Sequence, residues 1–192
     1  MELVIATGNS NRIGRLEKII TTLRPDIHLT NIFDLNINPP QENGSTQADN
    51  LLIKLKYYYR LLGKNIISED DIIEFKIKNK YFPVVSLNQF LPPDKDPFTG
   101  WLEYIKKKGI TSGQLVKSYG AVIDGEIKTG QVIIPLVIKT GQIYQNPVKK
   151  NVLNNFIGPK KIRKTFVEMT IMERDGYMQT QCSPVLKKLL AK

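Results

Sequence analysis

Consecutive acidic residues are the first feature of this chain that could do chemistry: Glu69, Asp70 and Asp71. They follow a short apolar segment, 65–68, that is predicted to be a strand ending there, and ligand sites of α/β proteins form at the carboxyl ends of strands. A fourth carboxylate, Asp49, lies near the first turn of a predicted helix. Carboxylates from two elements can hold Mg²⁺, which takes a few protein oxygens together with substrate phosphates. The structural alternatives are an exposed turn at 69–71 and a helix-capping role for Asp49.

The loop after the first predicted strand is a second candidate site. Small polar residues at 7–11, including Thr7 and Asn9, connect an apolar strand at 3–6 to a helix. Backbone N–H groups and the dipole at such a helix N-terminus suit a phosphate, and Arg12 adds a forked positive charge. Any α/β protein has junctions of this kind, so the loop taken alone favours a structural role.

Both candidates need elements that hold them, and the periodicity of apolar residues predicts such elements along the chain. Strand, helix and strand follow one another at the start, as in a parallel α/β protein. The expected strands are 3–6, 27–33, 65–68, 121–123 and 132–138. The expected helices are 13–23, 46–62, 99–107, 165–174 and 183–191, the last with Ser183 as its cap and Pro184 in its first turn. Residues 76–100 are rich in proline and are expected to be largely irregular.

Length and composition narrow the class of protein. With 192 residues, of which 41% are apolar, the chain can form a core as a single domain over 1–192, with two lobes at most. The 28 Lys and Arg against 18 Asp and Glu give a net charge of +10, which favours polyanionic partners: nucleotides, nucleic acid or an anionic membrane surface. Three consecutive tyrosines, Tyr57 to Tyr59, cannot form one base-stacking face of a helix, which disfavours nucleic acid.

Several classes of protein are excluded by what the sequence lacks. No apolar run approaches the roughly 18 residues of a membrane span, and no basic region precedes the first apolar run, as in a secretory signal. The lone cysteine, Cys182, excludes an internal disulfide. Cys182 lies far in sequence from the lone histidine, His28, which argues against a catalytic Cys–His pair without excluding it. We therefore expect a soluble protein of the cytoplasm with no membrane partner.

Motifs in three parts of the chain together resemble the inosine triphosphate pyrophosphatase family, whose members hydrolyse non-canonical purine nucleoside triphosphates. The family's Ala-Thr-x-Asn-x-x-Lys loop is similar to 6–12, with Arg12 in place of the lysine. Its Thr-Phe-x-Glu-Asn-Ala-x-x-Lys segment is similar to 46–54, and its Ala-Asp-Asp-Ser to 68–71. Its Thr-Phe-Ala-Glu-Met resembles 165–169, which Glu173-Arg174-Asp175 follows where the family has Glu-Lys-Asn.

The resemblance implies a role for each matching residue. It implies that Arg12 and Arg174 grip phosphates, with Lys54 as a further cation, and that Mg²⁺ is bound by three carboxylates: Asp49, Glu69 and Asp70. Asp70 is then the base that activates water. The remaining substrate contacts are implied for Thr7, Asn9, Asp71 and Asn154. Asp49 and Glu69 each differ from the family's residue by one methylene, which changes the reach of the carboxylate.

The residues that read the base in the family are not matched in this chain. The family's Ser-Gly after the acidic pair is Asp71-Ile72 here, and the aspartate of its Phe-Gly-Tyr-Asp-Pro is Asn154. Its Ser-His-Arg, which recognises the six-keto group of the purine, falls on Met178-Gln179-Thr180. Since a pocket that loses its hydrogen-bonding groups loses discrimination, the resemblance implies either an altered base preference or loss of catalysis.

The resemblance also implies a fold, an assembly and an activity. The expected fold is α/β, a long twisted mixed β-sheet flanked by helices, with two lobes and a central cleft, and the expected assembly is a homodimer. The first functional hypothesis is a Mg²⁺-dependent nucleoside triphosphate pyrophosphatase that breaks the α–β phosphate bond to give a monophosphate and pyrophosphate. The second is a catalytically inactive nucleotide- or polyanion-binding protein on the same fold.

Overall fold

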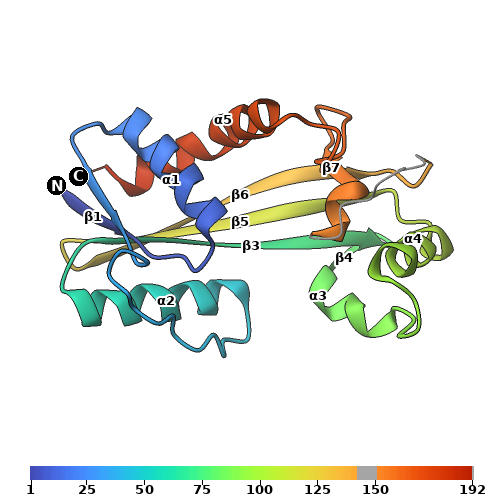
Figure 1. The fold of residues 1–192 in the computed structure, drawn as a ribbon, viewed down its shortest axis with the longest axis horizontal. Coiled ribbons are helices and arrows are strands. Elements are labelled where there is room, and N and C mark those ends of the chain that lie inside the picture. Colours follow the sequence, from blue (N-terminus) through green and yellow to red (C-terminus); the bar gives the residue numbers. More distant parts are fainter. Residues whose placement is uncertain (142–150, 192) are drawn as a thin grey trace. The chain divides into compact units, whose positions relative to one another are not determined.

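Strands and helices alternate along the first part of the chain (Figure 1). The structure is a computed structural model that describes residues 1–141 and 151–191, and of Asn11 only the backbone. The strands are β1 (Glu2–Ile5), β2 (His28–Asn31), β3 (Ile66–Ile77), β4 (Lys80–Pro83), β5 (Ser112–Ile123), β6 (Glu126–Ile138) and β7 (Ile157–Pro159). The α-helices are α1 (Ser10–Leu23), α2 (Gln47–Leu62), α3 (Val84–Leu87), α4 (Pro97–Lys108) and α5 (Ile171–Leu189). Two 3₁₀ helices are η1 (Asn88–Phe90) and η2 (Val152–Asn155).

The strands of the described residues form one seven-stranded sheet of mixed direction. Its order is β2-β1-β3-β5-β6-β7, and β4 pairs with β3 outside this path. β1 runs parallel to β2 and to β3, whereas β3 with β4 and β6 with β7 are antiparallel. Asp124 and Gly125, both with positive φ, form the tight turn between β5 and β6. The predicted α/β class with a mixed sheet flanked by helices is confirmed.

The chain divides into two compact units. The first unit comprises Met1–Asp71, Lys117–Val132 and Asp175–Lys192, and the second comprises Ile72–Val116 and Ile133–Arg174. Within the first unit, α1 and the main part of α5 lie on one face of the sheet and α2 on the other (Figure 1). Strands β3, β5 and β6 each contribute residues to both units.

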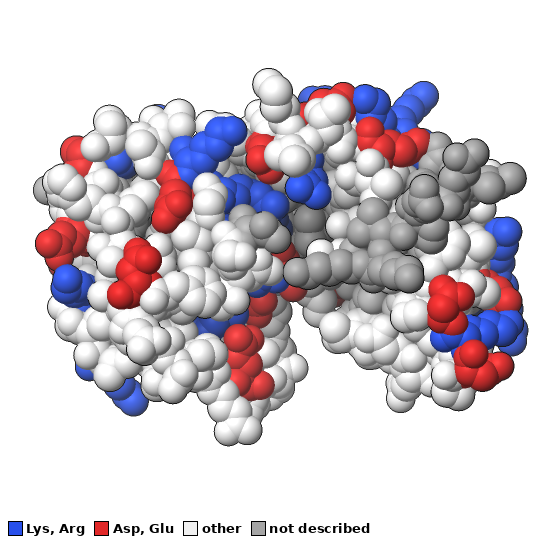
Figure 2. Space-filling view, viewed as in Figure 1, with Lys and Arg blue, Asp and Glu red and all other residues white. Residues whose placement is uncertain are grey.

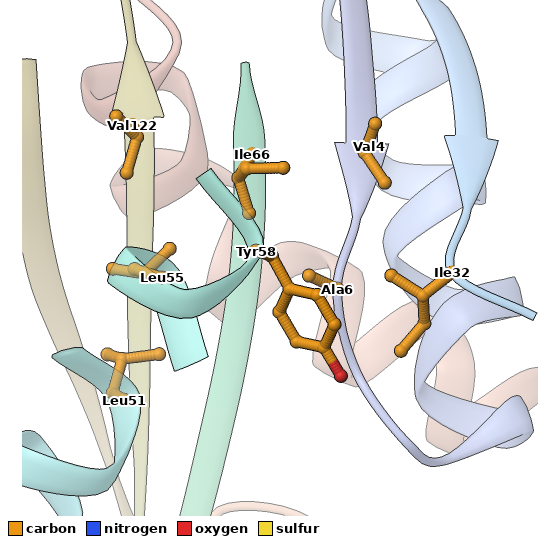
Figure 3. Packing of buried hydrophobic residues seen from close by; sticks show 8 residues of the cluster. All are labelled: Val4, Ala6, Ile32, Leu51, Leu55, Tyr58, Ile66 and Val122. Atoms are coloured by element: carbon orange, nitrogen blue, oxygen red, sulfur yellow. The ribbon is translucent and has the colours of Figure 1, made fainter. Parts of the chain in front are cut away.

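The core of the first unit is built where α2 packs on the sheet (Figure 3). Leu51, Leu55 and Tyr58, one helical turn apart, meet side chains of β1, β3 and β5. Gly120 on β5 lets the helix approach, because a Cβ there would lie 2.5 Å from a Leu55 methyl carbon. The remaining members of this cluster are Val4, Ala6, Ile32, Ile66 and Val122.

Helix α2 begins and ends where the sequence predicts. The Thr46 hydroxyl accepts the Asp49 N–H at 3.1 Å, and the Asp49 carboxylate accepts the Thr46 N–H at 3.0 Å and its hydroxyl at 2.8 Å. This reciprocal pair is a capping box, with Asp in the place that Glu usually takes. At the other end Gly63, at φ 61°, donates its N–H to the Tyr59 carbonyl.

Replacing Asp49 by alanine should therefore lower the stability of the fold. The substitution removes the acceptor for two donors at the start of a helix that carries the core of the first unit, and lost caps cost about 1 kcal/mol. Urea unfolding followed by circular dichroism measures the change. The control is Asp94→Ala, which removes the carboxylate of an exposed residue. Asp124 is not used because its positive φ of 51° would make alanine unfavourable there for a separate reason. An Asp49→Ala midpoint equal to that of the Asp94→Ala variant would show that the box contributes nothing.

The second unit has its own aromatic core. Trp101 packs edge-on against both Phe75 and Tyr104, and Phe98 stacks on Phe156. Helix α4 is capped by Asp96, whose carboxylate accepts the N–H groups of Phe98 and Thr99. The region 76–100, expected to be largely irregular, lies mostly in regular elements: the end of β3, the short elements β4, α3 and η1, and the first turn of α4.

Strand β3 is longer than predicted, which corrects the expected position of the acidic residues. The sequence predicts a strand that ends before Glu69, but β3 continues to Ile77. The acidic residues therefore lie inside the strand, not at its carboxyl end. The strand tolerates them because each carboxylate has a cationic partner, described below, and because apolar residues resume at Ile72 and Ile73.

The predicted pair of C-terminal helices is wrong: the chain forms a single helix, α5, with Pro184 inside it. The helix is preceded by a second capping box, in which Thr170 and Glu173 exchange hydrogen bonds. Ser183 does not cap a helix, since its hydroxyl donates to the Gln179 carbonyl one turn earlier. Thr165 begins a turn in which its own N–H donates to the Glu168 carboxylate.

Charged side chains are spread over the surface. In the view of Figure 2, Lys and Arg are interspersed with Asp and Glu rather than gathered by sign. Among residues 1–141 and 151–191, no helix has the length and apolarity needed to span a bilayer.

Candidate active site

The acidic residues of β3 divide between the two faces of the sheet. Because successive side chains of a strand alternate, Glu69 and Asp71 share one face and Asp70 takes the other. The side chain of Glu69 is 1% exposed, whereas those of Asp70 and Asp71 are 17% and 27% exposed. Three neighbouring carboxylates repel one another strongly at such burial unless cations lie close to them.

Arg12 reaches all three carboxylates from the first turn of α1. Its Nε lies 3.7 Å from a Glu69 oxygen, its Nη1 lies 3.6 Å from Asp70, and its Nη2 donates a hydrogen bond to Asp71. The Asn9 carbonyl accepts the Arg12 N–H at 2.9 Å and so fixes the start of the helix. The Arg12 side chain is 22% exposed, so an anion from solvent can still reach it.

Lys54 approaches from α2 on the face of Asp70. Its Nζ lies 3.6 Å from Asp70 Oδ2 and 3.5 Å from Glu42 Oε2, and the side chain is buried. Helix α2 fixes this position, because the capping box sets where the helix begins and Leu51 and Leu55 fix its rotation against the sheet.

Lys117 of β5 is the site residue that the sequence analysis missed. Its Nζ lies 3.3 Å from Glu69 Oε2 and 3.2 Å from Asp71 Oδ2, and its side chain is 0% exposed. It comes next to these carboxylates because β5 lies beside β3 in the sheet. One signal was available: a lysine inside the run 115–123, whose other residues apart from Ser118 are largely apolar, is unusual unless it is paired.

These six residues form what we call the charged cluster: Arg12, Lys54, Glu69, Asp70, Asp71 and Lys117. All of them belong to the first unit. Three carboxylates face three cations, so the formal charge of the cluster is zero. Most of the separations exceed 3.2 Å, which makes them ion pairs rather than tight hydrogen bonds. Such pairs can exchange partners when an anionic ligand arrives.

Polar groups lie behind the cluster on the side of Lys117. Neither Glu69 oxygen makes a hydrogen bond within the described part of the chain, and neither does the Tyr119 hydroxyl. Burial and the negative charge of Glu69 raise the pKa of Tyr119 well above its ordinary value. Burial likewise raises the pKa of the Cys182 thiol, so this cysteine is a neutral core residue. His28, by contrast, lies exposed on β2.

Asp49 does not join Glu69 and Asp70 in a metal site. Its carboxylate is the acceptor of the capping box of α2. Across 1–141 and 151–191, no group of three or more His, Cys, Asp or Glu side chains lies close enough to hold a metal ion. The predicted set of three metal-binding carboxylates is therefore not assembled.

The loop before α1 is tied to the acidic strand. The Ser68 hydroxyl donates to the Ala6 carbonyl at 2.6 Å, next to Thr7, which is buried. The Asn9 carbonyl also accepts the Ile13 N–H. The loop thus holds Arg12 in place, and its predicted contact with phosphate stays a prediction.

The other two predicted substrate-binding residues belong to the second unit. Asn154 lies in η2, where its N–H donates to the Asn151 carbonyl and its carbonyl accepts the Val167 N–H. Arg174 lies in the first turn of α5, and its buried Nε makes no hydrogen bond within the described residues. Their roles stay predictions.

Comparisons with known proteins agree with the predicted family. A model described as the Ham1 family matches residues 3–179. A curated dITP/XTP pyrophosphatase of Dictyoglomus thermophilum is 26% identical over 72 residues, which are 38% of this chain. The matched segment spans about a third (35%) of the length of that relative. The resemblance inferred from the motifs is confirmed.

Solved structures agree with the fold. The Ham1 protein of Staphylococcus aureus has a TM-score of 0.74 at 20% identity, over 99% of this chain and 98% of that chain. A HAM1 protein from Coxiella burnetii has a TM-score of 0.75 at 15% identity, with the same coverage of 99% and 98%. A nucleoside-triphosphatase, dITP/XTP pyrophosphatase, from Mycobacterium abscessus has a TM-score of 0.66 at 18% identity over 100% of both chains. At these identities the likeness concerns the fold.

Proposed function

Because the chain belongs to the Ham1 family, we propose that it is a hydrolase that cleaves the α–β phosphoanhydride bond of nucleoside triphosphates and releases a nucleoside monophosphate and pyrophosphate. The observation that supports this most directly is the charged cluster, where cations suited to phosphate lie against carboxylates suited to activating water. The substrate class follows from the family and from the curated relative, a dITP/XTP pyrophosphatase.

The cations of the cluster hold the triphosphate in this proposal. Arg12 is partly exposed, and its guanidinium can present two N–H groups to one phosphate. Lys54 adds a point charge from the other face of the sheet. The Asp70 oxygens lie 3.6 Å from the nearest nitrogen of Arg12 and of Lys54. When phosphate oxygens bind these two cations, they replace the Asp70 oxygens as partners. The carboxylate is thereby released to take part in the reaction.

Asp70 is the proposed general base. It is the only one of the three strand carboxylates that faces α2, it is partly exposed, and its side-chain contact with cations is an ion pair at 3.6 Å. A water oxygen attacks the phosphorus as one of its protons passes to Asp70, and the bond to the bridging oxygen breaks. The bridging oxygen leaves with its electron pair, and the proton on Asp70 returns to solvent.

The residues of this chain do not fit a divalent ion held by the predicted ligands. Pyrophosphatases of this family generally use a divalent metal. Here Asp49 caps α2, Glu69 and Asp70 lie on opposite faces of β3, and Glu69 faces Lys117. We therefore assign Mg²⁺ to the substrate, as the magnesium complex of the nucleotide, the form in which this ion usually meets few protein ligands.

Base preference is expected to differ from that implied by the family. Met178, at the position where the family has a serine of its base-reading motif, is buried on α5 and offers no hydrogen-bond donor. A site with fewer groups that pair with a base discriminates less between bases. We therefore propose a broad preference rather than a strict one for non-canonical purines.

Assembly and location complete the proposal. The family resemblance implies a homodimer, which light scattering after size-exclusion chromatography tests directly. The predicted cytoplasmic location stays a prediction.

Pyrophosphate release tests the proposed function. The purified chain is incubated with Mg²⁺ and a panel of nucleoside triphosphates that includes dITP, XTP and the common ones, and pyrophosphate and monophosphate are measured together. Equal amounts of both products with at least one nucleotide are expected. Orthophosphate without pyrophosphate would contradict the assigned bond, and binding without any product would favour the nucleotide-binding alternative. The neutral charge of the resting cluster is the observation that keeps this alternative open.

A further inference from the structure

A fully buried ammonium group is the feature of the charged cluster that the proposed reaction does not use. Lys117 is 0% exposed, and both of its close partners are carboxylate oxygens, at 3.3 Å and 3.2 Å. Burying a charged lysine costs several kcal/mol of desolvation, so it persists only where an opposite charge compensates it. The Lys117 ammonium and the Glu69 carboxylate therefore compensate each other's charge, and neither group would stay buried and charged without the other.

The position that Lys117 fills is one that suits a divalent cation. Glu69 and Asp71 stand two residues apart on the same face of β3, and both direct an oxygen toward the Lys117 nitrogen. Neither Glu69 oxygen makes a hydrogen bond within the described residues, so the ion pairs with Lys117 at 3.3 Å and with Arg12 at 3.7 Å are what compensates the charge of this carboxylate. The Lys117 nitrogen thus lies against one oxygen of Glu69 and one of Asp71, and carboxylate oxygens from two side chains are the kind of ligands that Mg²⁺ or Mn²⁺ takes.

The other two cations of the cluster do not replace Lys117. Arg12 is shared among three carboxylates and makes its hydrogen bond to Asp71, leaving 3.7 Å to Glu69. Lys54 pairs with Asp70 and Glu42 from the side of α2. Without Lys117, the face that carries Glu69 and Asp71 would hold two carboxylates against one shared guanidinium.

We propose that the Lys117 ammonium stands in place of a protein-held divalent cation at Glu69 and Asp71. The nucleotide-free protein then binds no divalent ion at these carboxylates, and the metal enters only with the substrate. That the metal enters with the substrate rests on the proposed function. That the nucleotide-free protein binds no divalent ion at Glu69 and Asp71 does not.

Calorimetric titration of MnCl₂ into the nucleotide-free chain tests this proposal. Lys117→Met keeps an unbranched side chain that is shorter by the charged nitrogen alone, and should bind one Mn²⁺ at least tenfold more tightly than the wild type. Adding Glu69→Gln to that variant should abolish the new site, because one of its two carboxylates is gone. Lys64→Met, which removes an exposed lysine paired with Glu2, is the matched control and should behave like the wild type.

A second comparison, of Mn²⁺ binding by the wild type and by Glu69→Gln, does not depend on whether Lys117→Met folds. Wild-type binding of Mn²⁺ no tighter than that of Glu69→Gln supports the proposal. Wild-type binding that Glu69→Gln abolishes overturns it, because the lysine would then share the site with a metal. A Lys117→Met chain that folds without gaining a Mn²⁺ site also overturns it. These titrations contain no nucleotide, so their results test the metal-binding proposal even if the protein proves to have no pyrophosphatase activity.

Discussion

Asp70→Asn should lower kcat for pyrophosphate release by at least about 100-fold, because removal of a general base typically costs 10²–10⁴. Asparagine keeps the shape of the side chain but cannot accept the proton of the attacking water. The Asp70 oxygens face Arg12 and Lys54 at 3.6 Å, so the substitution also leaves these two cations with fewer anionic partners. Phosphate binding should therefore be kept or strengthened, and KM should not rise. Steady-state kinetics on the best substrate of the panel separate kcat from KM.

Two comparisons make this result specific to Asp70. Asp124→Asn alters a turn residue at φ 51°, a conformation that asparagine adopts readily, and should leave kcat within twofold of the wild type. Circular dichroism and a thermal melt establish that Asp70→Asn is folded. A variant that keeps half of the wild-type kcat would exclude Asp70 as the base, and an increase in KM alone would assign it to binding.

Motifs in the sequence were sufficient to predict the parts of the site that come from single segments. Arg12 lies in the first turn of α1, Lys54 lies on α2 and the acidic run 69–71 follows the apolar start of β3, and each local pattern fixes where its side chain stands in that element. The capping box at Thr46 and Asp49 is a purely local signal of the same kind. The family resemblance then connected the three segments, which no local pattern can do. These five charged residues are indeed brought into contact.

The parts that the sequence did not predict depend on contacts between distant segments. Lys117 is 46 residues from Asp71 in sequence, and only the pairing of β5 beside β3 brings them together. For the same reason the end of β3 was misplaced, since three consecutive acidic residues resemble a turn until their distant cations are known. At the C-terminus, proline and serine resemble a helix start, but the Thr170–Glu173 box has already begun that helix.

Lys117→Met should also cost about 3–5 kcal/mol of folding free energy in EDTA, the range for removing one partner of a buried ion pair. Methionine fills a similar volume, so the loss reflects charge rather than packing. Most of it should come from Glu69, which is 1% exposed, because Asp71 is 27% exposed and can turn to water. Urea unfolding in EDTA measures the loss, and Mn²⁺ should restore part of it if the ion takes the vacated position.

A double-mutant cycle decides whether this loss arises from the charge left on Glu69. Glu69→Gln combined with Lys117→Met removes both charges, so the double variant should be more stable than Lys117→Met alone despite carrying one more substitution. Lys54→Met is the informative comparison, because its partners Asp70 and Glu42 are 17% and 41% exposed and water can solvate them after the lysine is gone. Its cost should be the smaller of the two. Equal losses for Lys54→Met and Lys117→Met, or a double variant less stable than Lys117→Met, would mean that packing rather than charge holds Lys117 in the cluster.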